Sequence, residues 1–590
     1  MNLKRYNSID IETDGLDIHD KINWLGIHTW DGTEEDKGET IIIDCNTEQA
    51  KMHAYLAELQ DKKYINVFHN GKFDTKMIKF HYGYTIPMTH DTMLLAYFCS
   101  TASELIANRG KWLGLKACAM RLLGVEDWDV SLGKKTSKSR EDVAKYLGYD
   151  VFYTRKIYEV LRKLIDPQDI KSYTLTMKVT EVYRDIEVNG VPINVEQLKD
   201  TLEEYEETLQ DIDLQLQSYA NINWNSPKQL QDLLYKELKL PIPCYTDSGQ
   251  PGTGIEALSK LGGKHPIVDL ILKRREADKA LTFLRDWLDK QKDGMIYPTF
   301  NLHTTVTGRT SCNNPNFQQV PRNKKLKTLF QSTDPEWEMV CMDYSQAELR
   351  TAAVVAGVEA IKYAYNNGED LHRNMAALVA GIPREEVSKQ QRTQAKAINF
   401  GYLYGMQAKS FVEYAKLSYG VDVTLEDATM IRNKFFESYH ELPKYYHDTQ
   451  EQLMSKGYVT SIMGRRYKVS FKDLHFPDLR QKFLRRVLNF PVQSAASDIM
   501  LCALIEIHDT LDPNEVKMVA TVHDSVEMLI KKNEHFKDNI LKIQSIMQHP
   551  KLRDKYITVP WDVPLVADIE VGPFGAGVEL DEYLKEAQHE

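Results

Sequence analysis

One stretch near the middle of this 590-residue chain, RTQAKAINFGYLYGM (392–406), most constrains how the chain can fold. Within it two cations and then two aromatic rings recur at every fourth residue: Arg392, Lys396, Phe400 and Tyr404. In an α-helix this spacing places the four side chains in one stripe. Such a stripe suits a ligand with a polyphosphate at one end and a flat base at the other. A surface Arg and Lys beside two core aromatic rings fits the spacing equally well, so this stretch alone leaves both interpretations open.

The composition is that of an ordinary folded protein, with 42% hydrophobic and 27% charged residues. No apolar run is long enough to predict a membrane-spanning helix, and the first residues enter a strand pattern without room for a signal peptide. The seven cysteines are scattered and include no CxxC pair. This pattern favours reduced thiols in a cytoplasmic compartment and disfavours a zinc site built from cysteines.

The formal net charge of −11 weighs against a nucleic-acid partner. The basic residues are nevertheless concentrated in four short patches: 133–140, 272–276, 322–327 and 479–486. Local patches can bind phosphates on a chain that is acidic overall, although each patch alone is typical of a solvated face. The charge pattern therefore leaves nucleic-acid binding open.

Residues 1–165 alternate strand and helix patterns, which predicts an α/β domain with its own core. We expect strands and helices in these ranges: 7–12, 22–30, 39–45 and 64–68 as strands, and 90–98 and 141–165 as helices. Four carboxylates and one tyrosine fall on or beside these elements: Asp10, Glu12, Asp74, Tyr146 and Asp150. Asp10 and Glu12 share a strand face, and Tyr146 and Asp150 share a helix face. Acidic oxygens are the ligands of hard cations such as Mg²⁺, and a two-metal site roughly 4 Å across promotes phosphodiester hydrolysis.

Each of these pieces alone has a structural alternative. An Asp-x-Glu strand is commonly a polar sheet face, and Asn70 is placed to cap the helix that carries Asp74. Together and in this order, the pieces resemble the proofreading 3′–5′ exonuclease domain, whose fold is of the RNase H-like type. The resemblance implies four metal ligands and a tyrosine that positions the attacking water: Asp10, Glu12, Asp74 and Asp150, with Tyr146.

From about residue 170 to 300 the pattern is almost entirely helical, with helices expected at 195–220, 226–238 and 265–290. Ser226 followed by Pro227 is typical of a helix start. A plain helical bundle accounts for this segment, and nothing in it predicts catalysis.

The segment 338–350 reads as an apolar strand with Asp343 at its end, followed by a helix. An acid at the mouth of a buried strand is costly unless it is paired or bound to a metal. Ser345 and Glu348 fit the S-x-x-E capping box, so Glu348 has a structural role available. A hairpin expected at 517–530 places Asp524 in its turn, where an exposed acid is ordinary.

Five motifs in order resemble the full series of family A DNA polymerases: TGR, DYSQAELR, the R-x3-K-x3-F-G-x2-YG helix, NFPVQ and VHD. The resemblance implies a right-hand polymerase with an α+β palm and helical thumb and fingers. We expect the following boundaries: exonuclease 1–168 and polymerase 169–590, with the thumb at about 190–295, the palm at about 296–350 and 491–590, and the fingers at about 351–490. The thumb shows no insertion for a processivity factor. Because the chain is short and no 5′-nuclease domain precedes these domains, a phage replication enzyme in the host cytoplasm is expected.

The resemblance also implies a role for each candidate residue of the polymerase. Asp343 and Asp524 are expected to hold two Mg²⁺ ions, with Mn²⁺ as an alternative, and Glu348 to exclude a ribose 2′-hydroxyl. The dNTP is expected to contact seven residues: Gln346, Glu348, His372, Arg392, Lys396, Phe400 and Tyr404. Primer–template DNA is expected to contact another seven: Arg309, Asn316, Gln319, Arg485, Asn489, Gln493 and His523. The expected enzyme is a monomer, with a helicase or another replisome protein as a possible partner.

The chain departs from the family pattern at several positions. Ser525 follows the motif aspartate where glutamate is usual, and Glu527, with the same strand parity, is a candidate substitute. Ala347 replaces a larger aliphatic residue and Ser494 replaces glycine, which loosens the expected packing. Phe400 in place of tyrosine predicts discrimination against dideoxynucleotides.

Three other functions compete with this interpretation. A stand-alone exonuclease of the RNase D kind accounts for residues 1–165 but leaves the rest of the chain without a role. A single-subunit RNA polymerase shares the Arg and Lys helix, but Glu348 and the proofreading domain argue against it. A non-enzymatic DNA-binding or clamp protein is disfavoured because both sites keep their carboxylates, although Ser525 weakens that argument.

Overall fold

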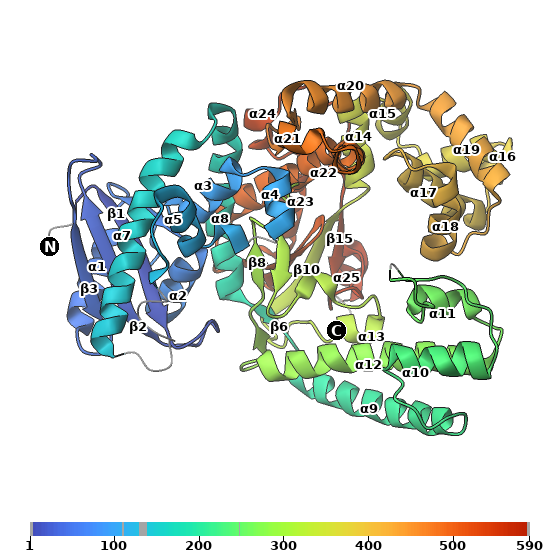
Figure 1. The fold of residues 1–590 in the computed structure, drawn as a ribbon, viewed down its shortest axis with the longest axis horizontal. Helices are drawn as coiled ribbons and strands as arrows, with labels where there is room; N and C mark the ends of the chain where they lie inside the picture. Colours follow the sequence, from blue (N-terminus) through green and yellow to red (C-terminus); the bar gives the residue numbers. More distant parts are fainter. Residues whose placement is uncertain (1–3, 109–110, 129–138, 247, 587–590) are drawn as a thin grey trace.

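The computed structural model describes residues 4–108, 111–128, 139–246 and 248–586. Most of the basic patch predicted at 133–140 therefore lies outside the described residues. Figure 1 shows the N-terminal unit at the left, the predicted thumb helices along the bottom and the predicted fingers at the upper right, with the palm strands between them.

The N-terminal unit is built on a five-stranded sheet with the order β3-β2-β1-β4-β5. Its strands have these bounds: β1 Tyr6–Thr13, β2 Ile22–Trp30, β3 Glu39–Asp44, β4 Ile65–Phe68 and β5 His90–Asp91. β1, β2 and β3 pair antiparallel, whereas β4 and β5 continue the sheet in parallel. The predicted RNase H-like fold is confirmed, and β1 with its two acids lies at the centre of the sheet.

Helices cover this sheet and supply the remaining residues of its site. Their bounds are α1 Gln49–Leu59, α2 Lys72–Tyr82, α3 Thr92–Cys99, α4 Ala102–Asn108, α5 Leu115–Leu123 and α7 Arg140–Leu164. α7 begins with a capping box between Ser139 and Asp142 and packs on β1 and β2. The helix predicted at 90–98 begins later, because the Asp91 carboxylate accepts hydrogen bonds from Met93 N and Leu94 N and so caps α3.

The palm is a four-stranded antiparallel sheet with the order β13-β14-β10-β15. Its strands are β10 Trp337–Tyr344, β13 Val516–Val522, β14 Ser525–Lys531 and β15 Ala567–Val571. The predicted hairpin is confirmed, with His523 and Asp524 between β13 and β14. Helix α23 (Phe536–Gln548) packs on β14 and β15. Short elements complete this part: β6 Val191–Pro192, β7 Met295–Ile296, β8 Thr299–Asn301, β9 Ser311–Asn313, α13 Lys324–Lys327, α24 Arg553–Tyr556 and α25 Leu580–Glu586.

Two long antiparallel helices form the predicted thumb, α9 (Val195–Gln217) and α12 (Pro266–Lys290), which lie side by side (Figure 1). Between them come α10 (Pro227–Gln231) and α11 (Ile255–Leu261). The helix predicted at 226–238 is confirmed, with Ser226 as its N-cap residue, and it continues after α10 as a π-helix over Asp232–Glu237. α8 (Ile170–Asn189) connects the thumb to the N-terminal unit.

The predicted fingers have an apolar core of their own, which includes Ile398, Tyr402 and Phe411. Their helices have these bounds: α14 Ala347–Ala356, α15 Glu359–Asn366, α16 Leu371–Ala380, α17 Lys389–Tyr402, α18 Ala408–Tyr419, α19 Leu425–Ser438 and α20 Glu441–Lys456. The hairpin β11 Tyr458–Thr460 and β12 Arg466–Lys468 and helix α21 Phe471–Leu474 lead back to the palm.

One described helix, α22 (Pro477–Thr510), is long and apolar enough by length and composition to cross a membrane. The sequence prediction that no run reaches this length is therefore wrong for α22. Within its most apolar window, 89% of the residues are buried inside the protein. α22 packs against α8, α14 and α20, so its apolar character is that of a core helix.

A buried ionic cluster joins the N-terminal unit to the rest of the chain. Lys72 and Lys76 on α2 both contact Glu187 on α8, and Lys76 Nζ lies 3.2 Å from Glu187 Oε2. Phe300 N donates a hydrogen bond of 2.7 Å to Glu187 Oε1. The three charged residues are at most 8% exposed, so α2 is fixed to the polymerase part of the chain.

Candidate active sites

The structure brings the four predicted acids of the N-terminal unit together from three elements. Asp10 and Glu12 project from β1 and Asp150 from α7, and ligand oxygens of the three lie within 4.8 Å of one another. Asp74, in the first turn of α2, interacts with the Asp10 carboxyl group and accepts a hydrogen bond of 3.0 Å from Ile11 N. A cluster made only of carboxylates fits a hard divalent cation.

Burial and mutual repulsion raise the pKa of two acids in this cluster. Burial, followed by the charges of Asp74 and Asp150, raises the pKa of Asp10 well above its usual range. Burial also raises the pKa of Asp74 to about 7. A cation would offset this repulsion, because it favours the ionised form of each carboxyl group.

Two residues that the sequence analysis missed complete this site. Trp128 Nε1 donates a hydrogen bond of 2.7 Å to Asp150 Oδ1. Lys116 Nζ donates to the Tyr146 hydroxyl and lies 4.4 Å from the centre of the Tyr146 ring. No motif or spacing singles out either residue, because α5 and the segment at Trp128 reach the site only through the fold.

The prediction that Asn70 caps α2 is wrong. The N-cap residue of α2 is Gly71, and no side chain accepts a hydrogen bond there. Asn70 instead has φ of 60°, and its N–H donates to Asp91, as does that of Gly71.

The second acidic site lies on the palm sheet. Asp343 at the end of β10 pairs in register with Ser525 on one side and Asp568 on the other. Asp343 and Asp524 line one cavity of about 580 Å³. The walls of the cleft partly desolvate the Asp343 carboxyl group, and together with the charge of Asp524 they raise its pKa to about 6. The rest of the Asp343 side chain contacts solvent. The pKa of Asp524 is also raised, mainly by burial. This donor set also fits a divalent cation.

Four more carboxylates line this cavity: Glu348, Glu527, Asp568 and Glu570. Glu527 was predicted from its strand parity with Ser525, whereas the two acids of β15 were not predicted. The Asp-x-Glu spacing in ADIEV could have suggested them, since it repeats the pattern of Asp10 and Glu12.

Glu348 links the palm to the fingers, and its predicted capping role is wrong. The N-cap residue of α14 is Gln346, which has φ of 56°, and no side chain caps the helix. The Glu348 carboxylate instead accepts a hydrogen bond of 2.5 Å from the Tyr404 hydroxyl and another from Arg309. Three predicted site residues from separate segments thus form one hydrogen-bonded cluster at the cavity.

Three residues of the predicted stripe lie on α17, whereas Tyr404 follows the end of this helix, which the sequence predicted to continue to Met406. Arg392, Lys396, Phe400 and Tyr404 are all half-buried, whereas Ala395, Ile398 and Tyr402 on the other face are buried in the fingers core. Phe400 lines the palm cavity beside Glu348. Phe400 and Tyr404 also pack against the fingers core, so the alternative of a surface Arg and Lys beside two core aromatic rings shares this geometry, and the binding role of the stripe stays a prediction.

Two residues of α16 and its cap support the stripe. Arg392 Nε donates a hydrogen bond of 2.5 Å to Asp370 Oδ2, while Asp370 Oδ1 caps α16. His372, for which a surface or capping position was the alternative, is buried, and its Nδ1 lies 2.9 Å from Asn399 Nδ2. Gln346, the other predicted nucleotide contact, accepts a hydrogen bond of 3.0 Å from the Tyr365 hydroxyl.

Of the predicted DNA contacts, His523 lines the cavity. Arg309 donates a hydrogen bond to Glu348, which also lines the cavity. The structure does not place the other five on the cavity wall: Asn316, Gln319, Arg485, Asn489 and Gln493. Gln319 and Arg485 are exposed. The Oδ1 atoms of Asn316 and Asn489 are buried without a hydrogen-bond partner among the described residues, so both amides have unused acceptors.

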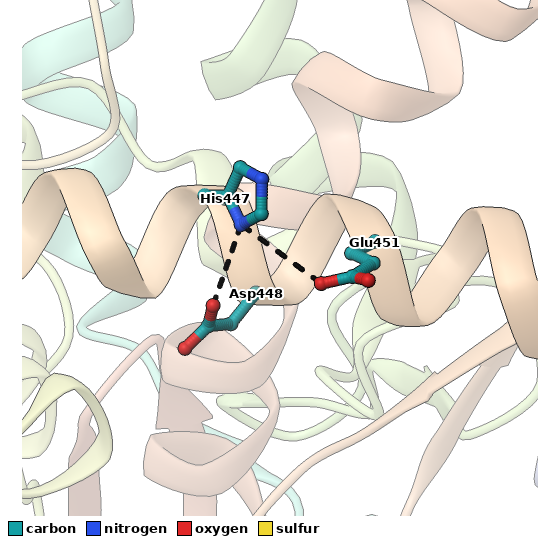
Figure 2. A group of neighbouring side chains, drawn as sticks. All are labelled: His447, Asp448 and Glu451. Atoms are coloured by element: carbon teal, nitrogen blue, oxygen red, sulfur yellow. Dashed lines mark hydrogen bonds and ion pairs between the residues drawn. The ribbon is translucent and has the colours of Figure 1, made fainter.

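One further group of candidate metal ligands lies on the surface of α20. His447, Asp448 and Glu451 point toward one another from this helix (Figure 2), with His447 Nδ1 3.4 Å from Asp448 Oδ1. All three side chains are exposed. This group is explained by ordinary surface ion pairs.

Comparison with known proteins follows the same division of the chain. Residues 195–574 match the model of DNA polymerase family A, and residues 2–166 match that of the 3′–5′ exonuclease. DNA polymerase I of Aquifex aeolicus (strain VF5) is 30% identical over 558 residues, covering 88% of this chain and 88% of that protein. DNA polymerase I of Bacillus subtilis (strain 168) is 29% identical and covers 82% of this chain. The match spans 54% of the Bacillus protein, so this chain corresponds to about half of its length.

A solved structure shows the same fold. It is the POL domain of Pol1 from M. smegmatis in complex with DNA primer-template and dNTP. The TM-score is 0.82 at 23% sequence identity, and the similarity covers 96% of this chain and 95% of that one. The likeness supports the right-hand architecture that the sequence predicts.

Proposed function

Because the chain belongs to DNA polymerase family A and carries a 3′–5′ exonuclease domain, we propose that its two acidic clusters are the two active sites of a replicative enzyme. The palm site extends a DNA primer with dNTPs, and the N-terminal site removes nucleotides from the primer 3′ end. One observation carries the proposal: a single cavity is lined by Asp343 and Asp524 of the palm together with Phe400 of the fingers. This arrangement offers charge for a cation beside an aromatic surface for a nucleotide.

We propose that Asp343 and Asp524 hold the polymerase cations, with Mg²⁺ as the preferred ion. Bound Mg²⁺ lowers the pKa of a coordinated hydroxyl and neutralises phosphate charge. The reaction is attack of the primer 3′-hydroxyl on the α-phosphate of the dNTP, with pyrophosphate as the leaving group. In the exonuclease site, Asp10, Glu12, Asp74 and Asp150 hold the cations, and Tyr146 orients the attacking water.

The α17 stripe binds and orients the dNTP in this proposal. Arg392 and Lys396 carry the positive charge for the triphosphate, and the buried His372 lies beside them. Phe400 lies against the sugar and base, and Tyr404 occupies the template side. Glu348, held by Tyr404 and Arg309, blocks the space that a ribose 2′-hydroxyl requires.

We assign binding of the primer–template to the seven predicted DNA contacts. The thumb, palm and fingers are proposed to have the boundaries that the sequence predicts. The relatives compared above are bacterial, so a phage source stays a prediction. The same holds for a cytoplasmic location, for the monomeric state and for a helicase partner.

Primer extension and primer degradation in the presence of Mg²⁺ test the proposal. We expect Asp343→Ala to abolish synthesis and leave degradation intact, and Asp10→Ala to abolish degradation and leave synthesis intact. Loss of both activities in either variant, with unchanged folding, would contradict the assignment of two separate sites. Extension with NTPs as efficient as with dNTPs would favour an RNA polymerase instead.

A further inference from the structure

The palm sheet carries a buried carboxylate, Glu527, for which the proposed mechanism has no role. It is 0% exposed, although it lines the cavity that contains Asp343 and Asp524. Its Oε1 atom accepts a hydrogen bond of 2.9 Å from Ser525 Oγ and one of 3.3 Å from Cys341 Sγ. Its Oε2 atom has no hydrogen-bond partner among the described residues.

A purely structural residue at this position has no need of a charge. Burying a carboxylate with an unpartnered oxygen is unfavourable, whereas an apolar side chain of similar size is not. Val526 and Met528, which project from the opposite face of β14, are apolar and fully buried, whereas Glu527 lies on the face of the cavity. A buried carboxylate at this place indicates a function directed toward the cavity.

The strand register shows how Glu527 relates to the catalytic acids. Ser525 lies opposite Asp343, and Glu527 lies opposite Cys341, one row deeper on the same face. Diagonal neighbours on a sheet are about 7 Å apart, and ligand oxygens lie about 2.0–2.6 Å from Mg²⁺ or Ca²⁺. Glu527 is thus placed to act through Ser525 rather than as a direct ligand.

We propose that Glu527 is a positioning residue of the polymerase site, which orients the Ser525 hydroxyl beside Asp343 and adds negative charge behind the cation. In this arrangement the serine–glutamate pair supplies what a carboxylate directly after Asp524 would supply. The inference rests on the proposed assignment of Asp343 and Asp524 as cation ligands.

The test uses the full-length chain in an Asp10→Ala background, which weakens cation binding at the exonuclease site. Mn²⁺ binding is measured by electron paramagnetic resonance without DNA or dNTP. We expect Glu527→Gln to weaken Mn²⁺ binding at the palm site by about tenfold. Ser525→Ala should weaken it less, and Ser525→Glu combined with Glu527→Gln should restore it.

Glu570→Gln is the matched control. Glu570 lies in the same row on the other side of Cys341 but is exposed, so solvent screens its charge. We expect its effect on Mn²⁺ binding to be less than about twofold. An equal effect of Glu527→Gln and Glu570→Gln would overturn the specific role of Glu527.

A second readout separates positioning from folding. In the chain with Asp10 intact, Glu527→Gln should raise the Mg²⁺ concentration for half-maximal primer extension and leave that for exonuclease activity unchanged. Unchanged Mn²⁺ binding, or equal loss of both activities with a lower melting temperature, would overturn the proposal. If Asp343→Ala keeps wild-type primer extension and Mn²⁺ binding, the proposed polymerase active site itself is wrong. That result differs from a failure of the Glu527 proposal alone, in which Asp343→Ala still abolishes extension.

Discussion

Phe400 of the predicted fingers lines the same cavity as the palm acids Asp343 and Asp524, where we propose that the dNTP binds. Its ring has no hydrogen-bonding group, so it cannot compensate for a 3′-hydroxyl that is missing from a dideoxynucleotide. We expect Phe400→Tyr to improve ddNTP use relative to dNTP use by about tenfold, in line with the gain of one hydrogen bond. Competitive incorporation on one primer–template measures this ratio. Equal use of ddNTP and dNTP by the unmodified chain would contradict the prediction.

The raised pKa values of the two sites predict different pH dependences. The pKa of Asp74 is raised to about 7 and that of Asp343 to about 6, in both cases mainly by burial. A protonated carboxyl group binds a cation poorly, so each activity falls as the pH decreases through the pKa of its ligand. At limiting Mg²⁺ we expect exonuclease activity to decline first, near pH 7, and synthesis nearer pH 6. Rates measured on one preparation from pH 5.5 to 8.5 test the order, and saturating Mg²⁺ should move both midpoints downward.

Helix α17 depends on its neighbour α16 for the orientation of Arg392. Asp370 caps α16 with one oxygen and accepts a hydrogen bond from Arg392 Nε with the other. Asp370→Asn keeps the cap but removes the ion pair, so the guanidinium loses its fixed position. We expect the KM for dNTP to rise about three- to tenfold, since a partly exposed charged contact contributes about 1 kcal/mol.

The control for this variant is Asp370→Ala, which removes the cap as well. It should add about 1 kcal/mol of helix destabilisation, visible as a lower melting temperature that Asp370→Asn does not share. An unchanged KM in Asp370→Asn would show that α17 orients Arg392 without help from α16.

At the scale of the whole molecule, the cluster of Lys72, Lys76 and Glu187 holds the exonuclease domain on the polymerase. Glu187→Ala leaves two buried ammonium groups unpaired, which costs about 3–5 kcal/mol in comparable buried ion pairs. Because α2 also carries Asp74, we expect exonuclease activity to fall more than synthesis. Denaturant unfolding and the two activity assays measure these effects. As a control, Lys63→Ala removes an exposed ion pair to Asp61 and should change neither.

Local patterns were sufficient to predict most secondary structure and the principal acids. The alternation of β1 predicted that Asp10 and Glu12 share a face, and the four-residue spacing predicted the stripe of Arg392, Lys396 and Phe400 on α17. Both inferences depend only on the periods of strands and helices. They hold because each of these elements has one face toward a core.

Only the tertiary structure decided which groups meet across the chain. Ser345 and Glu348 have the spacing of a capping box, but Glu348 binds Arg309 and Tyr404 instead, 39 and 56 residues away. Lys116 and Trp128 have no local signal, because they reach the site only through domain packing. The same register places Glu527 in the row below Asp343. The sequence by itself therefore determined the elements and their chemistry, whereas the long-range pairing decided which of these side chains form a site.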